Sequence, residues 1–100
     1  MAKIKANEAL VKALQAWDID HLYGIPGDSI DAVVDSLRTV RDQFKFYHVR
    51  HEEVASLAAG SYTKMTGKIG VALSIGGPGL VHLLNGMYCL LYTSPSPRDL

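Results

Sequence analysis

The sequence predicts an α/β fold, in which helices cover both faces of a parallel sheet. Hydrophobic patterns typical of helices and of strands alternate along the chain, beginning and ending with a helix. Three strands are expected near residues 20–24, 45–50 and 69–75. They are about 25 residues apart, which suits right-handed crossovers between parallel neighbours. The expected fold ends after the third strand and a fourth helix.

Each predicted helix carries apolar residues at helical spacing. The first covers residues 6–17. The second follows Asp28, which with Asp31 forms the pattern of an N-cap and an acidic residue three positions on. The third ends at Gly67, and the fourth follows the turn at residues 76–79. The marking residues are Leu10, Val11, Leu14 and Trp17 in the first helix, Ile30, Val33, Val34 and Leu37 in the second, and Val54, Leu57, Ala58, Tyr62 and Met65 in the third.

Three glycine-rich or acidic segments follow the expected strands: YGIPGD, RHEE and SIGGPG. The third strand, IGVALSI, is apolar almost throughout, as a strand buried on both faces should be. Parallel sheets bind ligands at the carboxyl ends of their strands, where glycine admits close approach and helix N-termini offer free N–H groups. The three segments together predict a binding site at this edge, although each alone also suits a tight turn.

Composition argues against several classes of protein. Ten basic and ten acidic residues give no net charge and form no basic run, which disfavours nucleic acid and anionic membranes as partners. No apolar stretch approaches the 18 residues of a membrane span. The single cysteine, Cys89, cannot form an internal disulfide, which fits the cytoplasm. Ala55 stands where the zinc helix motif H-E-x-x-H needs its second histidine, so no metal site is expected.

Three motifs in order resemble the N-terminal pyrimidine-binding domain of thiamine-diphosphate-dependent enzymes. They are YGIPGD, VRHEEVASLAAGSYTKMTGKIGV and GGPGLVHLLNGMY, and the resemblance covers about residues 3–88. Within that family the chain most resembles the pyruvate oxidases. Acetolactate synthases share the Arg-His-Glu start and the Gly-Pro-Gly turn, but they usually have Asn at the position of His82 and lack HLLNG. The resemblance implies a flavodoxin-like fold.

The resemblance assigns catalysis to Glu52, which in this family binds N1′ of the cofactor's aminopyrimidine ring. An acid that an apolar pocket keeps protonated favours the imino tautomer of that ring, whose exocyclic nitrogen then serves as a base beside the thiazolium C2. Burial raises a carboxyl pKa, so the small apolar helix after Glu52 suits this task. Glu53 lies about 100° further around the helix and is expected to face solvent or a salt-bridge partner.

Further cofactor-binding residues follow from the same resemblance. Backbone from the turn after the first strand and from the turn after the third is expected to line the pyrimidine ring, and one histidine of the fourth helix lies near it. Asn85 and Gly86 are expected only to pack helices. The cofactor-binding residues implied in addition to Glu52 are Ile25, Pro26, Gly27, Pro78, Gly79 and His82.

The C-terminal end departs from the family. Residues 1–90 are expected to form an incomplete pyrimidine-binding domain, and residues 91–100 a non-native or disordered tail, because Pro95 and Pro97 forbid a continued helix or a central strand. By the resemblance, Mg²⁺ with the diphosphate, and FAD, belong to domains missing here. The active site forms between subunits of a homodimer or homotetramer, so the fragment alone is expected to be inactive.

The implied parent is a cytoplasmic pyruvate oxidase, a flavoprotein that converts pyruvate, phosphate and oxygen into acetyl phosphate, carbon dioxide and hydrogen peroxide. Two other interpretations remain open. The parent could be an acetolactate synthase or another thiamine enzyme acting on 2-oxo acids. Alternatively, the chain could be a non-enzymatic binding module of flavodoxin-like shape, in which substitution of Glu52 would have no effect.

Overall fold

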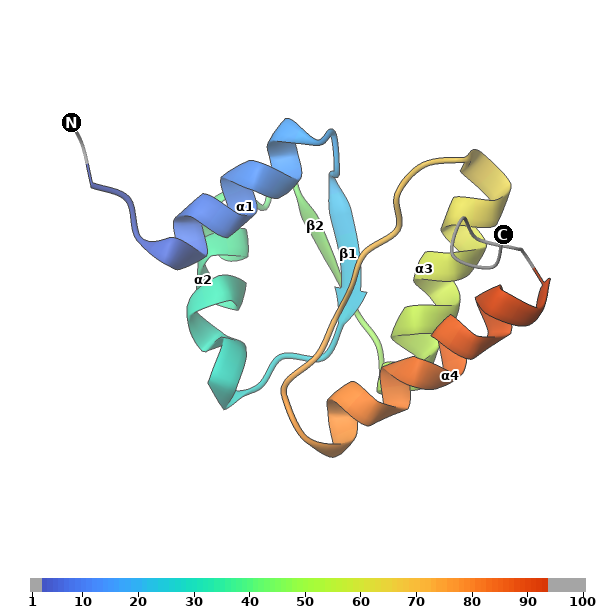
Figure 1. Cartoon of the computed structure of the whole chain (residues 1–100). Coiled ribbons are helices and arrows are strands. Elements are labelled where there is room, and N and C mark those ends of the chain that lie inside the picture. The colour runs from blue at the N-terminus through green and yellow to red at the C-terminus, as the bar shows by residue number, and fades with distance from the viewer. Residues whose placement is uncertain (1–2, 94–100) are drawn as a thin grey trace.

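The computed structural model describes residues 3–93 and has the α/β fold that the sequence predicts (Figure 1). One turn of 3-10 helix, η1, precedes the second α-helix. In chain order the elements are α1 (Ala6–Ala16), β1 (His21–Gly24), η1 (Asp28–Ile30), α2 (Asp31–Thr39), β2 (Lys45–His48), α3 (Glu52–Thr66), β3 (Ala72–Leu73) and α4 (Pro78–Thr93).

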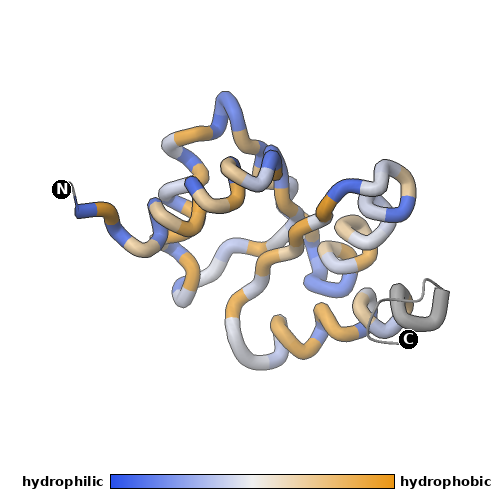
Figure 2. Tube along the Cα trace, turned by 45° about the horizontal axis from the view of Figure 1, so that its top comes forward, coloured by the Kyte–Doolittle hydropathy of each residue, from blue (hydrophilic) through white to orange (hydrophobic). Residues whose placement is uncertain are grey.

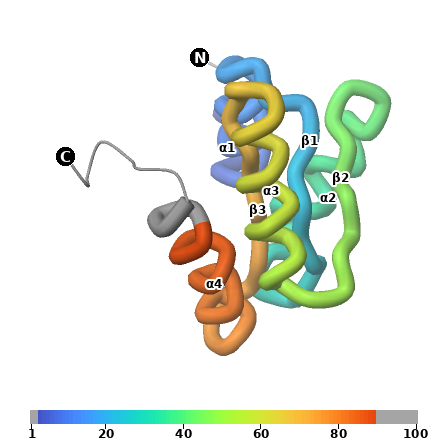
Figure 3. The backbone as a smooth tube through the Cα atoms, turned by 90° about the vertical axis from the view of Figure 1, so that its right-hand side faces the viewer, coloured from blue at the N-terminus to red at the C-terminus, as the bar shows by residue number. Residues whose placement is uncertain are grey.

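The sheet has the strand order β2-β1-β3. Its central strand, β1, is parallel to both neighbours, so that Tyr23 lies opposite Tyr47 on one side and Ala72 on the other. The parallel arrangement is therefore confirmed. Helices α1 and α2 cover one face of the sheet, α3 covers the other, and α4 lies against α3 (Figures 1 and 3). The turns after all three strands consequently share one edge.

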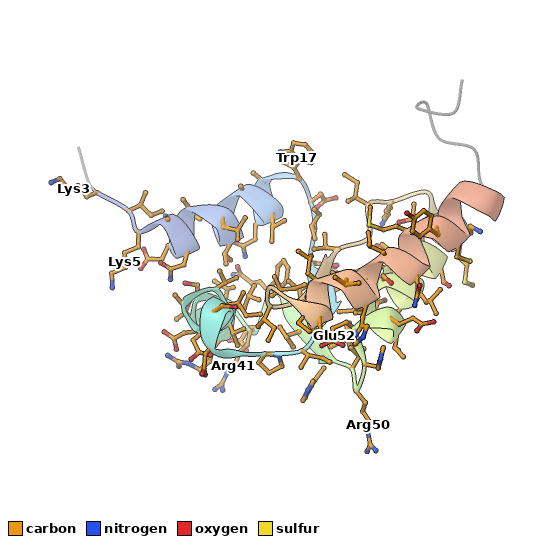
Figure 4. The ribbon with its side chains drawn as sticks, turned by 60° about the horizontal axis from the view of Figure 1, so that its bottom comes forward. Lys3, Lys5, Trp17, Arg41, Arg50 and Glu52 are labelled. Carbon is orange, nitrogen blue, oxygen red and sulfur yellow. The ribbon has the colours of Figure 1, made fainter. Side chains whose placement is uncertain are left out.

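The main apolar cluster lies between the sheet and helices α1 and α2. Trp17 does not join it, although its spacing in the first helix suggested that it would. It follows the last residue of α1, and its side chain is 71% exposed and projects away from the molecule (Figure 4). Because α1 ends at Ala16, Trp17 does not continue the buried face of the helix. The buried members of the cluster are Val11, Ile19, Leu22, Leu37 and Phe44.

Helix α3 buries a face of small residues rather than its large apolar ones. Val54, Leu57 and Met65, which marked this helix in the sequence, are exposed. The reason is that α3 lies between the sheet and α4, where close approach of the backbones requires small side chains. Gly86 of α4 sits where an added Cβ would collide with the side chain of Ser56. The buried residues of α3 are Ala55, Ser56, Ala59 and Gly60.

The third strand is shorter and less buried than IGVALSI predicts. Only Ala72 and Leu73 are strand residues, the segment from Val71 to Ile75 is half-buried, and Ile69 is exposed. Within residues 3–93 this strand pairs on one side only, with β1, so β3 is an edge strand of the described sheet. The second strand likewise ends at residue 48, earlier than the expected residue 50.

The helix ends agree with the sequence only in part. Asp28 is the first residue of η1 and not the N-cap of α2. The N-cap position of α2 is Ile30, which makes no side-chain cap, so the predicted acidic cap is wrong. Gly67 is confirmed as the end of α3, with a left-handed φ of 73°.

The last helix, α4, continues to Thr93, beyond the expected domain boundary at residue 90. Residues 94–100 of the predicted tail lie outside the described residues, so the assignment of the tail stays a prediction. No helix within residues 3–93 has the length and apolar character needed to cross a membrane.

Candidate functional site

The carboxyl edge of the sheet brings Glu52 and His82 together from different parts of the chain. Glu52 is the first residue of α3, just after β2, and His82 lies one turn into α4, after β3. His82 Nδ1 is 3.1 Å from Glu52 Oε2. The Glu52 side chain is 18% exposed and that of His82 is 43% exposed, so the carboxyl group is the more buried of the two. Figure 4 shows Glu52 beside the start of α4, whereas Arg50 points away.

Gly79 provides space for the other oxygen of the same carboxyl group. A Cβ added at Gly79 would lie 2.9 Å from Glu52 Oε1, closer than such atoms normally approach. The glycine is buried, and its place at the start of α4 puts it directly over the carboxyl group. The carboxyl group of Glu52 is thus held between an imidazole and a glycine.

His51 is a member of this site that the sequence analysis did not identify. It is the N-cap residue of α3, and its Nδ1 accepts a hydrogen bond of 3.1 Å from the backbone N–H of Glu53. Its ring also stacks on the ring of His82, with centroids 4.6 Å apart and planes at 26°. The position just before the acidic pair was the available signal. Because histidine is not among the usual N-cap residues, that signal was weak.

The structure lowers the pKa of Glu52. The main cause is its own backbone N–H at the start of α3, followed by the hydrogen bond with His82. Partial burial acts in the opposite direction but is outweighed. The sequence analysis expected an apolar pocket to raise this pKa, and that expectation is wrong for the chain by itself. The helix start and the imidazole favour the carboxylate.

The neighbouring carboxyl group of Glu53 also contacts α4. Asn85 Nδ2 donates to Glu53 Oε2 over 3.3 Å, so the expected solvent or salt-bridge partner is in fact an amide. Gly86, the next residue, packs on Ser56, as expected of a helix-packing residue. Two consecutive glutamates therefore bind two side chains one helical turn apart on α4, which fixes the register between the helices.

The remaining predicted cofactor-binding residues lie on adjoining turns. A Cβ at Gly27 would be 2.5 Å from Ile75 Cγ2, so the turn after β1 packs on the segment after β3. Pro26 is exposed and forms part of an open groove of about 490 Å³ between α2 and β2. Ile25 is half-buried, and Pro78 is exposed at the first position of α4. The structure thus brings together Glu52, Gly79 and His82, with the other residues on either side.

The site also offers three candidate metal ligands, because ligand atoms of His51, Glu52 and His82 lie within 4.8 Å of one another. A metal needs the lone pair of an unprotonated ring nitrogen. In His51 that lone pair is engaged by the Glu53 N–H. The two rings are also stacked, with planes at 26°. In the structure, His51 and His82 each use Nδ1 in a hydrogen bond.

A second hollow, of about 550 Å³, lies at the opposite edge of the sheet, where β1 and β2 begin. Its aromatic wall was not singled out in the sequence. His21 packs edge-on against three tyrosines, and its Nδ1 is 2.7 Å from Asp20 Oδ1. Burial and the neighbouring phenols raise the pKa of Tyr23. The three tyrosines are Tyr23, Tyr47 and Tyr62.

Comparison with known proteins identifies the family. The family described as thiamine pyrophosphate enzyme, N-terminal TPP binding domain, matches residues 4–95. The chain belongs to this family. Thiamine pyrophosphate is another name for thiamine diphosphate, so the resemblance found in the sequence is confirmed, together with its cofactor.

Relatives of this TPP-binding domain occur in several enzymes. A Bacillus subtilis protein whose name describes it as thiamine pyrophosphate-containing is 58% identical over 88 residues, which cover 88% of this chain and 15% of that protein. Pyruvate oxidase of Lactiplantibacillus plantarum is 52% identical over 85 residues, covering 85% of this chain and 14% of the enzyme. An acetolactate synthase of Arthrospira platensis is 37% identical over 81 residues, covering 79% and 14%. The chain therefore spans about one seventh of the length of these relatives.

Proposed function

We propose that the chain is the pyrimidine-binding domain of a pyruvate oxidase, which converts pyruvate, phosphate and oxygen into acetyl phosphate, carbon dioxide and hydrogen peroxide. The observation that carries the proposal is the Glu52 carboxyl group, held by His82 at the carboxyl edge of the sheet. His82 occupies the position where acetolactate synthases usually have Asn. The identity of 52% with a pyruvate oxidase, against 37% with an acetolactate synthase, also favours the oxidase.

The residues of this site fit the pyrimidine end of thiamine diphosphate. Bound thiamine diphosphate would supply a nucleophilic carbon at C2, and its thiazolium ring would serve as the electron sink. Glu52 can exchange a proton with N1′, because each carboxylate oxygen has two lone pairs and His82 uses only one of them. Gly79, without a side chain, leaves room for the carboxyl group beside the start of α4.

The charge state of Glu52 is part of this proposal. With the chain alone, the lowered pKa keeps the carboxylate ionised at neutral pH. An ionised carboxylate can accept the proton of an N1′–H group, or it can accept a strong hydrogen bond from that group. Any apolar enclosure that shifts this balance toward the acid has to come from outside the described residues, because within them the lowering causes outweigh burial. Such an enclosure fits a site shared between subunits.

The other parts of the enzyme are proposed on the same basis. Because the chain spans about one seventh of its relatives, the sites for Mg²⁺, the diphosphate and FAD are assigned to other domains. A homodimer or homotetramer would let the pyrimidine domain of one subunit meet the diphosphate domain of another. The 100-residue chain itself is then expected to lack activity.

The test compares two adjacent carboxyl groups in the full-length protein that carries this domain. Glu52→Gln should slow C2–H/D exchange of bound thiamine diphosphate by about 10²–10⁴-fold, because an amide cannot take over the acid–base role. Glu53→Gln should have a much smaller effect, because that carboxyl group is bound to Asn85. Exchange is followed by NMR after acid quench.

Two outcomes would contradict the assignment. If Glu53→Gln slows exchange and Glu52→Gln does not, the activating residue is Glu53. If neither variant changes the rate, the acidic pair is only a solvated helix start. Product analysis separates the oxidase from the synthase to which the chain is also related: acetyl phosphate and hydrogen peroxide support the proposal, and acetolactate contradicts it.

A further inference from the structure

We propose that His51 is a positioning residue for Glu52, acting through the ring of His82. This inference rests on the proposed function, since it concerns the residue that activates the cofactor. Two contacts of His51 carry it: the cap on α3 and the stack on His82. Together they link the beginning of α3 to α4 at the point where the Glu52 carboxyl group is held.

The first step is the helix cap. The backbone of His51 is extended, with φ −148° and ψ 141°, and its side chain accepts the N–H of Glu53. The first N–H groups of a helix have no partner within the helix, so this bond determines where α3 begins. Glu52 is thereby fixed as the first helical residue, with its own N–H near its carboxyl group.

The second step concerns the protons on the two rings. Because Nδ1 of His51 accepts a hydrogen bond, the proton of the neutral ring is on Nε2. In His82 the assignment is reversed. Its Nδ1 faces a carboxylate oxygen 3.1 Å away and therefore carries the donated proton. The cap thus fixes His51 as the neutral partner in a stack with the histidine that donates to Glu52.

The third step is the orientation of His82. Its side chain is 43% exposed, so solvent alone would leave the ring free to turn about its Cβ–Cγ bond. The stack with His51, at 4.6 Å and 26°, restricts this rotation and keeps Nδ1 directed at Oε2. Gly79 packs against the other oxygen of the Glu52 carboxyl group and limits its movement. The neighbouring carboxyl group of Glu53 is bound to Asn85 and not to His82.

The experiment separates the cap from the stack with two variants of the 100-residue chain. His51→Asn retains a good capping side chain and removes the ring, because Asn is among the preferred N-cap residues. His51→Phe retains a ring that can stack and removes the capping acceptor. His48→Asn is the matched control, an exposed histidine at the end of β2. Long-range ¹H–¹⁵N spectra report which nitrogen of His82 carries the proton, and ¹³C spectra follow the titration of the Glu52 carboxyl group.

His51→Asn should keep slow amide exchange at Glu53 but lose the preference of His82 for the proton on Nδ1. The Glu52 titration should then move upward toward its ordinary value. His51→Phe should show the reverse: faster exchange at Glu53 with the protonation of His82 retained. A role limited to capping would speed amide exchange at Glu53 in His51→Phe alone and would change the protonation of His82 in neither variant.

The proposal is overturned if His51→Asn leaves the His82 spectrum and the Glu52 titration as they are in the unmodified chain and in His48→Asn. It is also overturned if His51→Phe shifts them as far as His51→Asn does, since the ring then has no separate role. These measurements contain no thiamine diphosphate. A negative result here therefore does not contradict the proposed function. A negative result in the C2–H/D exchange experiment likewise does not contradict this arrangement of side chains.

Discussion

At the scale of single residues, Glu52 shows that position in a helix determines charge more than the apolar character of its neighbours. The sequence after Glu52 is rich in alanine, which suggested a carboxyl group held neutral by burial. In the structure the same residue is the first of α3, where its backbone N–H and His82 stabilise the anion. A pattern of residue types contains no information about hydrogen bonds made by the backbone.

The space at Gly79 gives a direct test of how the carboxyl group is held. Gly79→Ala places a methyl group 2.9 Å from Glu52 Oε1, so the carboxyl group has to move and its bond with His82 should weaken. The pKa of Glu52 is then expected to rise toward its ordinary value, as followed by ¹³C NMR. Gly76→Ala is the control, since a Cβ there meets nothing within 4 Å. If Glu52 titrates alike in Gly79→Ala and Gly76→Ala, Gly79 does not constrain the carboxyl group.

The lowered pKa of Glu52 also predicts how stability depends on pH. A carboxyl group with a lower pKa in the folded than in the unfolded state stabilises the fold above its unfolded pKa, and this contribution is lost as the pH falls through the folded value. The difference in unfolding free energy between the chain and Glu52→Gln should therefore be constant near neutral pH and shrink below about pH 4.5. Urea unfolding at pH 7, 5 and 3 measures it. A difference that grows toward acid pH would mean that the pKa is raised.

At the scale of elements, the order and the parallel direction of the strands could be predicted because crossover spacing and alternating periodicity are local properties. The buried face of α3 could not be. Val54 and Leu57 suggested one face, whereas the packed face consists of alanine, serine and glycine. Which face is buried depends on α4, a helix distant in sequence, and small residues carry little hydrophobic signal. The length of β3 was misjudged because apolar character does not show how many neighbours a strand has.

The crossing of α3 and α4 is predicted to tolerate no side chain at Gly86. In Gly86→Ala the added Cβ overlaps the side chain of Ser56, and overpacking of this kind typically costs about 1–3 kcal/mol. Helix propensity alone would favour Ala over Gly by about 1 kcal/mol, so the sign of the change is informative. Thermal unfolding gives that sign. A raised midpoint would show that the two helices do not meet at this residue.

At the scale of the whole molecule, the predicted site was only partly recoverable from sequence. Motif position located Glu52, Gly79 and His82, and the structure brings these three together. His51 was missed because it stacks on His82, a residue far away in the sequence.

The outer surface of α4 is a second feature at the scale of the whole molecule, with apolar residues along the helix (Figure 2). Its exposed members are Leu80, Val81, Leu84, Met87 and Tyr88.

This exposed helix surface predicts binding of an apolar dye such as ANS. Exposed apolar patches of more than a few hundred Å² are unusual on monomeric proteins and attract such ligands. The pair Val81→Lys and Met87→Lys should reduce dye fluorescence, because both side chains are more than half exposed on α4. The pair Ala9→Lys and Ala13→Lys adds the same charge to an exposed part of α1 and should have little effect. Equal loss in both pairs would assign the effect to charge alone.

The main apolar cluster and the Glu52–His82 contact are formed by different parts of the chain, which affects the order in which they can fold during synthesis. All buried members of the main cluster lie between Val11 and Phe44, joined later by half-buried Val71 and Leu73. The contact of Glu52 with His82 needs a residue 30 positions further along the chain. Because a chain leaves the ribosome from its N-terminus, the first half can begin to pack before the partner of Glu52 has been translated. The contact between Glu52 and His82 therefore forms only after most of the apolar cluster has been synthesised.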